Sequence, residues 1–220
     1  MIRWGGMEIL ETLDELVDPG HTALLLWDFD KSVVSNSFNY DSMIENTANL
    51  LRAARERDVR VLYAQQNNMR IVGDTGAPTI RMRMKRQGGG IVEIMNRPEP
   101  KGIPPRPQLV EQVKPREGDV IFEKFLPNAF LGTCFEWWLK KYGIKTILLT
   151  GVNVATGING TAREAINLGY YAVVVRDCVG TRSEQDYQIA LAAMERVMDI
   201  YDSSEIVESW RKKPEKKNEN

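Results

Sequence analysis

The chain has 220 residues, 43% of them hydrophobic, and a formal net charge of -1 at pH 7. These values suit a single globular α/β domain with a substantial core, and they argue against a general nucleic-acid binder or a membrane-surface protein. No signal-peptide pattern begins the sequence and no apolar run approaches the ~18 residues of a membrane span, so a cytoplasmic protein without membrane partners is expected.

The few cysteines and the single histidine limit the kinds of catalytic and metal sites that the chain can form. Cys134 and Cys178 are not spaced as a CxxC motif, so both are expected to be free structural thiols. His21 is the only histidine, and it lies before the first predicted strand. A histidine base, a Ser-His-Asp triad and a histidine-rich zinc site are therefore disfavoured. We expect no metal and no other cofactor.

Taken in order, the chain alternates predicted strands and helices after an N-terminal extension of residues 1–20 with a helical turn at 8–16. Short apolar runs predict strands at 22–27, 59–64, 119–122, 146–150, 172–175 and 199–201. Helical spacing of apolar residues predicts helices at 40–56, 130–142, 157–169 and 183–198. The pattern predicts one three-layer α/β domain over residues 1–210, with a doubly wound, mainly parallel six-stranded sheet. Residues 211–220 are predicted to be a polar, disordered tail.

An irregular insertion at 69–118 separates two of these strands. Between residues 69 and 106 it carries eight basic residues against three acidic ones. It is either a solvated surface or a basic cover over an anionic substrate. Arg81 and Arg83 are candidate substrate-binding residues, and their side chains would point the same way if the backbone there is extended.

Chemistry is expected at the carboxyl ends of the strands, where ligands bind in sheets of this kind. Asp28 follows the first strand directly, and a partly desolvated carboxylate there has a raised pKa that suits a general acid or base. Lys124 and Gln65 follow two other strands at the same edge. The simpler alternatives are a helix-capping aspartate, a surface lysine and a loop amide.

One local resemblance concerns the segment LLLWDFDKSVV, which is similar to the first motif of haloacid-dehalogenase-type phosphatases. That resemblance implies Asp28 as nucleophile, Asp30 as acid and a magnesium ion. It covers about a dozen residues, and Thr150 could pass for the second motif. The downstream lysine is then missing, because no lysine occurs between Lys145 and Lys212.

A second resemblance covers nearly the whole chain, and it is to the isochorismatase-like (cysteine hydrolase) superfamily. An apolar strand ending in Asp28 matches the first motif, and KFLPNAF with Lys124 matches the lysine motif. The signature turn matches Gly151-Val152 followed ten residues later by Thr161-Ala162-Arg163. The resemblance implies a cis peptide at Val152-Asn153, with these two residues contacting substrate.

Counting back from Thr161 puts Gly157 where amidase members of this superfamily carry the nucleophilic cysteine. Members that hydrolyse isochorismate-type vinyl ethers also lack the cysteine. The resemblance then implies that Asp28 donates a proton, that Lys124 orients it and helps bind an anionic substrate, and that Gln65 contacts the substrate. The metal-binding Asp-x-His-x-x-His run of nicotinamidase members has no counterpart here.

The sequence thus predicts a Cys-independent hydrolase of a small anionic, vinyl-ether-type substrate, with Asp28, Lys124 and Gly157 at the catalytic site. The resemblance also implies a homo-oligomer. One alternative is a catalytically silent family member that serves as a binding or assembly subunit. A cysteine-free amidase and a magnesium-dependent phosphatase are weaker alternatives.

Overall fold

The computed structural model describes residues 1–66, 77–78, 81, 84–85 and 108–212. The chain divides into two compact units, one of residues 1–66 with 107–220 and the other of residues 67–106. The second unit lies inside the insertion that interrupts the predicted domain of residues 1–210. Its described residues are helical, including the exposed Arg81. The extended backbone that would point Arg81 and Arg83 the same way is therefore not found at Arg81, and Arg83 lies outside the described residues.

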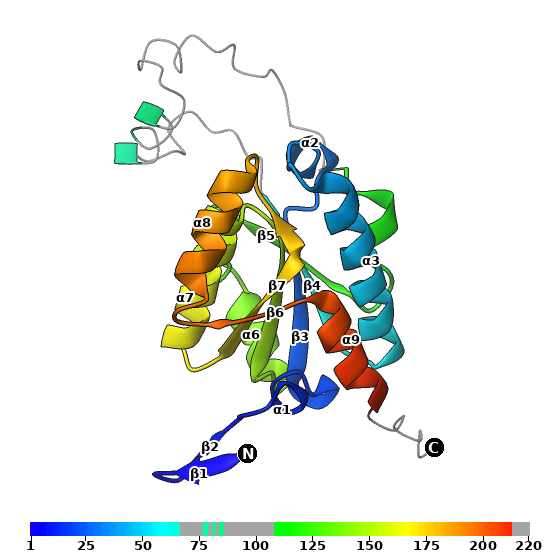
Figure 1. Ribbon diagram of the computed structural model, residues 1–220, viewed down its shortest axis with the longest axis vertical. Coiled ribbons are helices and arrows are strands. Elements are labelled where there is room, and N and C mark those ends of the chain that lie inside the picture. The colour runs from blue at the N-terminus through cyan, green and yellow to red at the C-terminus, as the bar shows by residue number, and fades with distance from the viewer. Residues whose placement is uncertain (67–76, 79–80, 82–83, 86–107, 213–220) are drawn as a thin grey trace. The chain divides into compact units, whose positions relative to one another are not determined.

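A six-stranded parallel sheet forms the centre of the first unit (Figure 1). Its strands are β3 (Thr22–Trp27), β4 (Arg60–Gln66), β5 (Val120–Lys124), β6 (Thr146–Val152), β7 (Tyr171–Gly180) and β8 (Asp199–Tyr201). They lie in the order β5-β4-β3-β6-β7-β8, and every neighbouring pair is parallel. This order confirms the predicted doubly wound sheet.

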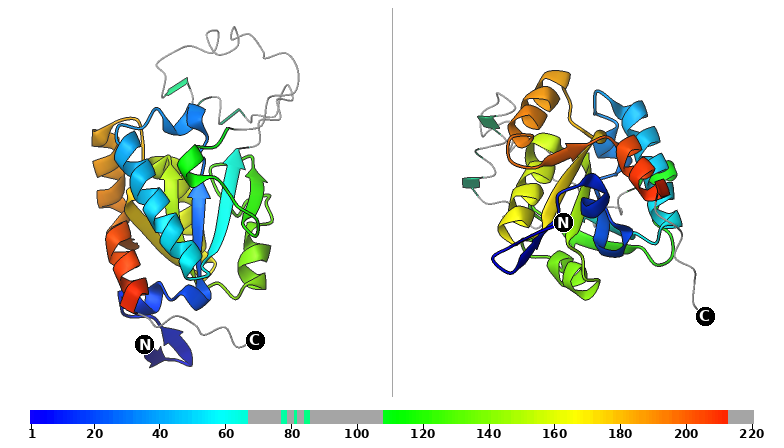
Figure 2. Two further views of the ribbon diagram at one scale, coloured as in Figure 1. Left: turned by 90° about the vertical axis from the view of Figure 1, so that its right-hand side faces the viewer. Right: turned by 60° about the horizontal axis from the view of Figure 1, so that its bottom comes forward.

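Helices cover both faces of the sheet, which confirms the predicted three layers (Figures 1 and 2). One face carries α1 (Leu13–Leu16), α3 (Tyr40–Glu56) and α9 (Ser203–Lys212), and the other carries α6 (Phe135–Lys141), α7 (Asn159–Asn167) and α8 (Glu184–Met194). The buried strand β3 serves both cores, because successive side chains point to opposite faces. Leu24 and Leu26 enter the α3 side, whereas Leu25 and Trp27 enter the α6 side.

The N-terminal extension differs from the prediction. A hairpin of β1 (Ile2–Trp4) and β2 (Met7–Ile9) takes in the start of the helical turn expected at 8–16, and only α1 is helical there. Gly5 and Gly6 both have positive φ, which suits the tight turn of a two-residue hairpin. A short helix α2 (Lys31–Val34) follows Asp30 and was also not predicted.

The C-terminal helix α9 was not predicted either, and it takes in residues 211–212 of the expected tail. Asp177 stabilises the start of this helix, because its carboxylate accepts hydrogen bonds from the Ser203 N–H at 2.8 Å and the Ser203 hydroxyl at 2.6 Å. The apolar face of α9 includes the buried Ile206 and Trp210. Residues 213–220 lie outside the described part of the chain.

Several predicted boundaries were also wrong. The helix expected at 130–142 begins only at Phe135, and the one expected at 183–198 ends at Met194. Strand β5 runs on to Lys124, and β7 runs on to Gly180, beyond the predicted end at residue 175. Within the described ranges, no helix is long and apolar enough to cross a membrane.

Candidate active site

The switch point of this sheet lies beyond the carboxyl ends of β3 and β6. The chain leaves these two neighbouring strands toward opposite sides, and ligands bind at such a switch point. Asp28 follows β3, and its N–H donates to the carbonyl of Ala64 at 3.0 Å. Its φ of 52° lies in the left-handed region, which aspartate tolerates better than most residues. The carboxylate is thus presented at the edge of the sheet.

A buried ion pair lies at this switch point. The Lys124 ammonium donates to Asp28 Oδ2 at 2.8 Å and to Gln66 Oε1 at 3.1 Å. The Lys124 side chain is only 1% exposed and that of Asp28 is 16% exposed. The other carboxylate oxygen, Asp28 Oδ1, is buried and has no hydrogen-bond partner among the described residues. One acceptor therefore remains for a substrate or a proton.

Burial moves both members of the pair toward their neutral forms. It raises the pKa of the Asp28 carboxyl, and the Lys124 ammonium opposes this shift by charge and hydrogen bonding. Burial likewise lowers the pKa of the Lys124 ammonium, and Asp28 opposes that shift. A carboxyl that holds its proton more tightly than usual can donate it near neutral pH, which is what a general acid requires.

Trp27 links the ion pair to Gly157. Its ring centroid lies 4.0 Å from the Lys124 Nζ, a cation–π distance. A Cβ added to Gly157 would lie 2.6 Å from three atoms of the Trp27 indole. Sequence analysis did not select Trp27, although it directly precedes Asp28.

The turn after β6 has the cis peptide at Val152-Asn153 that the resemblance implied. The side-chain oxygen of Asn153 accepts from the Ala155 N–H at 2.8 Å, and its amide donates to the Thr181 hydroxyl at 2.7 Å. Asn153 thereby caps a short π-helix, Val154–Ile158, which carries Gly157. The Val152 side chain is buried in the core on the α3 side. A substrate contact by either residue stays a prediction.

The glutamine that contacts Lys124 is Gln66, a residue that the sequence analysis did not select. The side chains of Gln65 and Gln66 point to opposite faces of β4. Gln65 lies on the same face as Tyr63, and that face packs toward α3. A substrate contact by Gln65 stays a prediction. Four consecutive polar residues at 65–68 gave no alternation from which to choose between the two glutamines.

Asp30, which the phosphatase resemblance implied as an acid, forms a local cap. Its Oδ1 accepts from the Ser32 N–H at 2.7 Å and from the Ser32 hydroxyl at 2.6 Å, so it caps α2. Across the described ranges, no group of three or more His, Cys, Asp or Glu side chains could hold a metal ion.

The two cysteines lie apart from the contacts of the ion pair. Cys178 is buried on β7 in the core on the α3 side, and burial raises the pKa of its thiol well above its ordinary value. Cys134 is exposed at the residue before α6, and both thiols are free, as expected. Neither sulfur is among the described contacts of Asp28 or Lys124.

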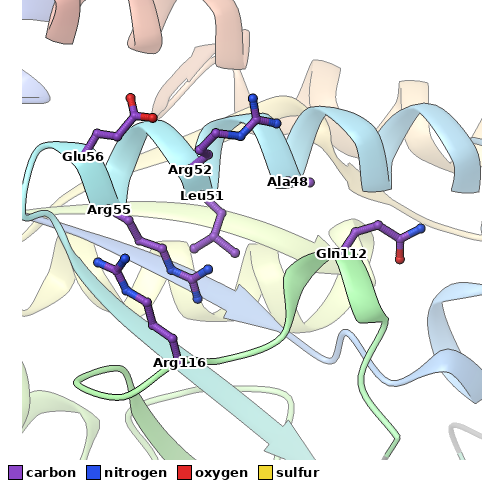
Figure 3. Close-up of a pocket in the computed structure, with 7 residues that line it drawn as sticks. All are labelled: Ala48, Leu51, Arg52, Arg55, Glu56, Gln112 and Arg116. Atoms are coloured by element: carbon purple, nitrogen blue, oxygen red, sulfur yellow. The ribbon is translucent and has the colours of Figure 1, made fainter.

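A separate groove of about 580 Å³ lies along the C-terminal half of α3 (Figure 3). Its lining residues are Ala48, Leu51, Arg52, Arg55, Glu56, Gln112 and Arg116. Arg55 is committed to structure there, because it donates to Asp119 at 2.6 Å and to the Lys114 carbonyl at 3.0 Å. The groove contains none of the predicted site residues, so the switch point at Asp28 remains the candidate active site.

Comparisons with known proteins agree with this fold. A model of the isochorismatase domain matches residues 22–205. The chain is similar to the uncharacterized isochorismatase family protein YwoC of Bacillus subtilis, with 33% identity over 38% of this chain and 44% of that protein. It is also similar to ureidoacrylate amidohydrolase RutB of Pseudomonas savastanoi, with 26% identity over 72% of this chain and 70% of that protein. A cysteine hydrolase structure from Pseudomonas syringae matches with a TM-score of 0.73 and 20% identity, over 89% of this chain and 95% of that chain.

Proposed function

The chain belongs to the isochorismatase family, whose model matches most of its length, and we propose that it is a hydrolase that works without a cysteine nucleophile. The observation that carries this proposal is the buried pair of Asp28 and Lys124, 2.8 Å apart at the switch point of the sheet. Trp27 contacts both Lys124 and Gly157, so the space next to the pair is filled by a ring rather than a thiol.

Asp28 is the general acid of the proposed reaction. It transfers its proton to the terminal carbon of a vinyl ether, which leaves a cation shared between the ether oxygen and the adjacent carbon. Water adds to that carbon and gives up a proton, and the resulting hemiketal breaks into a carbonyl compound and an alcohol. The Asp28 carboxylate stabilises the cation and is reprotonated by the end of the cycle, while the Lys124 ammonium holds the carboxylate in place.

A small anionic substrate suits the basic residues of this chain. The Lys124 ammonium is one cation at the site, and the insertion carries five more basic than acidic residues between positions 69 and 106. The relative RutB is named for ureidoacrylate, which is itself a carboxylate. We assign substrate carboxylates to Arg81 and Arg83. Replacing either arginine with Ala should raise KM for an anionic substrate by about tenfold, equivalent to about 1.4 kcal/mol.

Two assays test the reaction class. Release of pyruvate from isochorismate, an enolpyruvyl ether, is compared with release of ammonia from ureidoacrylate. Asp28→Asn should reduce turnover of the ether by at least about 100-fold, because an amide cannot donate an acidic proton. Asp30→Asn is the matched control, since asparagine also caps a helix and the rate should stay near that of the parent.

A near-parental rate in folded Asp28→Asn would refute the acid role. Turnover of ureidoacrylate but not of the ether would instead favour the cysteine-free amidase. If neither compound is turned over although anionic ligands bind, the catalytically silent binding subunit is favoured.

Self-association is part of the proposal. Phe125, Leu126, Leu131 and Trp137 are between 45% and 57% exposed in and near the segment that follows β5, and exposed apolar clusters often mark protein contacts. Light scattering coupled to size exclusion should give a mass that is a multiple of 25.0 kDa. A monomeric mass at micromolar concentration would contradict this part.

A further inference from the structure

Trp27 occupies an unusual place for so large a side chain. It is the last residue of β3, its side chain is on the α6 side of the sheet, and it is only 1% exposed. Its backbone is fixed by pairing with Gly151, where any Cβ would collide with the Trp27 carbonyl. The indole therefore has little freedom to move away from its neighbours.

The indole and Gly157 fit together with no space between them. A Cβ on residue 157 would lie 2.6 Å from Cε2, Cζ2 and Nε1 of Trp27, whereas carbon atoms in contact are about 3.5–4.0 Å apart. The three atoms form one edge of the indole, so a Cβ at this position would collide with that edge. A cysteine carries the same Cβ and a larger sulfur beyond it, so position 157 accepts a side chain only if the ring is displaced or removed.

The same ring also contacts the ion pair. Lys124 Nζ lies 4.0 Å from the Trp27 ring centroid while donating to Asp28. A desolvated cation–π contact of this kind favours the charged ammonium. Trp27 thus both excludes a side chain at position 157 and helps to hold Lys124 next to Asp28.

We infer that Trp27 is the residue that determines which reactions this site can perform. Its indole occupies the volume that a nucleophilic side chain at position 157 would need, which limits the site to acid–base chemistry by Asp28 and Lys124. The inference rests on the proposed function in placing the reaction at this pair. Amides whose cleavage needs a covalent thioester are excluded as substrates, and bonds labile to acid are selected.

The test introduces a thiol at position 157 with and without the indole. All variants carry Cys134→Ser and Cys178→Ser, so the introduced thiol is the only one. Gly157→Cys, Trp27→Val and their combination are compared by thermal unfolding and by the rate of alkylation with iodoacetamide, which forms a carbon–sulfur bond and releases iodide. Ala155→Cys, at an exposed position in the same turn, is the matched control.

Gly157→Cys should lower Tm by about 5–10 °C when Trp27 is present, because overpacked cores are destabilised. In the Trp27→Val background the same change should leave Tm unchanged or raise it. The thiol introduced by Gly157→Cys should be alkylated at least about tenfold faster when Trp27 is replaced by Val than when Trp27 is present, since buried thiols are inert. The thiol of Ala155→Cys should react at one rate in both backgrounds.

If Gly157→Cys does not fold, Gly157→Ala is measured in both backgrounds, and the same reversal in Tm is expected. Equal Tm effects in the two backgrounds, with alkylation as fast as in the Ala155→Cys control, would overturn the inference. No substrate enters this experiment. Its failure would leave the acid role of Asp28 standing, whereas a near-parental rate in Asp28→Asn would leave the steric role of Trp27 standing.

Discussion

Removing the Lys124 ammonium should destabilise the protein in a way that depends on pH. In Lys124→Met the Asp28 carboxylate stays buried but loses its partner at 2.8 Å. Breaking a buried pair costs about 3–5 kcal/mol when the remaining group stays charged. Asp28 can avoid part of this loss by binding a proton, because its pKa is already raised by burial and the opposing effect of Lys124 is gone.

The sign of the pH dependence follows from that raised pKa. Below the unfolded-state pKa of about 3.9, Asp28 is protonated in both the folded and the unfolded variant, and the loss of stability relative to the parent is smallest. Above it the unfolded state releases the proton and the folded variant keeps it. The free energy of unfolding should then fall by about 1.4 kcal/mol per pH unit until the pH passes the folded-state pKa of Asp28.

Urea unfolding at pH 5, 6, 7 and 8 measures this effect, followed by far-UV circular dichroism because Trp27 fluorescence responds to Lys124 directly. The parent, Lys124→Met, Asp28→Asn and the double variant form a cycle. We expect a coupling energy of about 3 kcal/mol at pH 7, and the double variant should lose the slope. A Lys124→Met deficit that is the same at every pH, or a coupling energy below about 0.5 kcal/mol, would refute the reasoning.

Three further predictions concern other parts of the molecule. The double variant Cys134→Ser, Cys178→Ser should keep the parental rate of turnover. Iodoacetamide should modify the exposed Cys134 long before Cys178, because burial raises the pKa of the Cys178 thiol. Inactivation that follows the modification of either thiol would contradict this. Arg55→Met should lower the free energy of unfolding by about 2–3 kcal/mol, because the buried Asp119 carboxylate loses its ion-pair partner at 2.6 Å and keeps the hydrogen bond from the Arg116 N–H. An unchanged urea midpoint would contradict it. EDTA should leave turnover unchanged, and a rate restored by added magnesium would favour the phosphatase.

Sequence reasoning located Asp28 and Lys124 because their positions follow from topology. Both come at the carboxyl ends of predicted strands, and parallel strands place those ends at one edge of the sheet. The structure brings their side chains together across β4, with Gln66 between them. Sequence reasoning named Gln65 as a substrate contact and did not find Gln66 beside Lys124, since a strand buried on both faces has no alternation that fixes which way its last residues point.

The contact between Trp27 and Gly157 could not be predicted in the same way. No periodicity links residues that are 130 positions apart, and each fits its local pattern without the other: Trp27 ends an apolar strand, and Gly157 lies in a turn. The only available signal was that the two residues are complementary in size. Trp27, next to Asp28, has a very large side chain, whereas Gly157 has none at the position where amidase members carry a cysteine. Such a signal becomes evidence only when the distance between the two residues is known.

Two elements, the N-terminal hairpin and helix α9, were not predicted because their local sequence signals are weak. The hairpin at β1 and β2 has a Gly5-Gly6 turn, which is a recognisable hairpin signal, but its strands are only three residues long. Helix α9 has the apolar spacing of Ile206 and Trp210. Its first turn is held by Asp177, a residue 26 positions earlier, and local sequence cannot show such a cap.

The Asp28–Lys124 pair itself is evidence against the silent alternative. Two charged groups buried at a sheet edge are desolvated at considerable cost, and apolar side chains of similar volume often stabilise a core at least as well. The fold therefore does not need this pair, and Asp28 Oδ1 is left without a partner among the described residues. Buried groups with shifted pKa values and unused hydrogen-bonding capacity are more typical of reactive sites than of structural ones. With Trp27 filling the space at Gly157, the arrangement favours a site built for proton transfer over one that has merely lost a nucleophile.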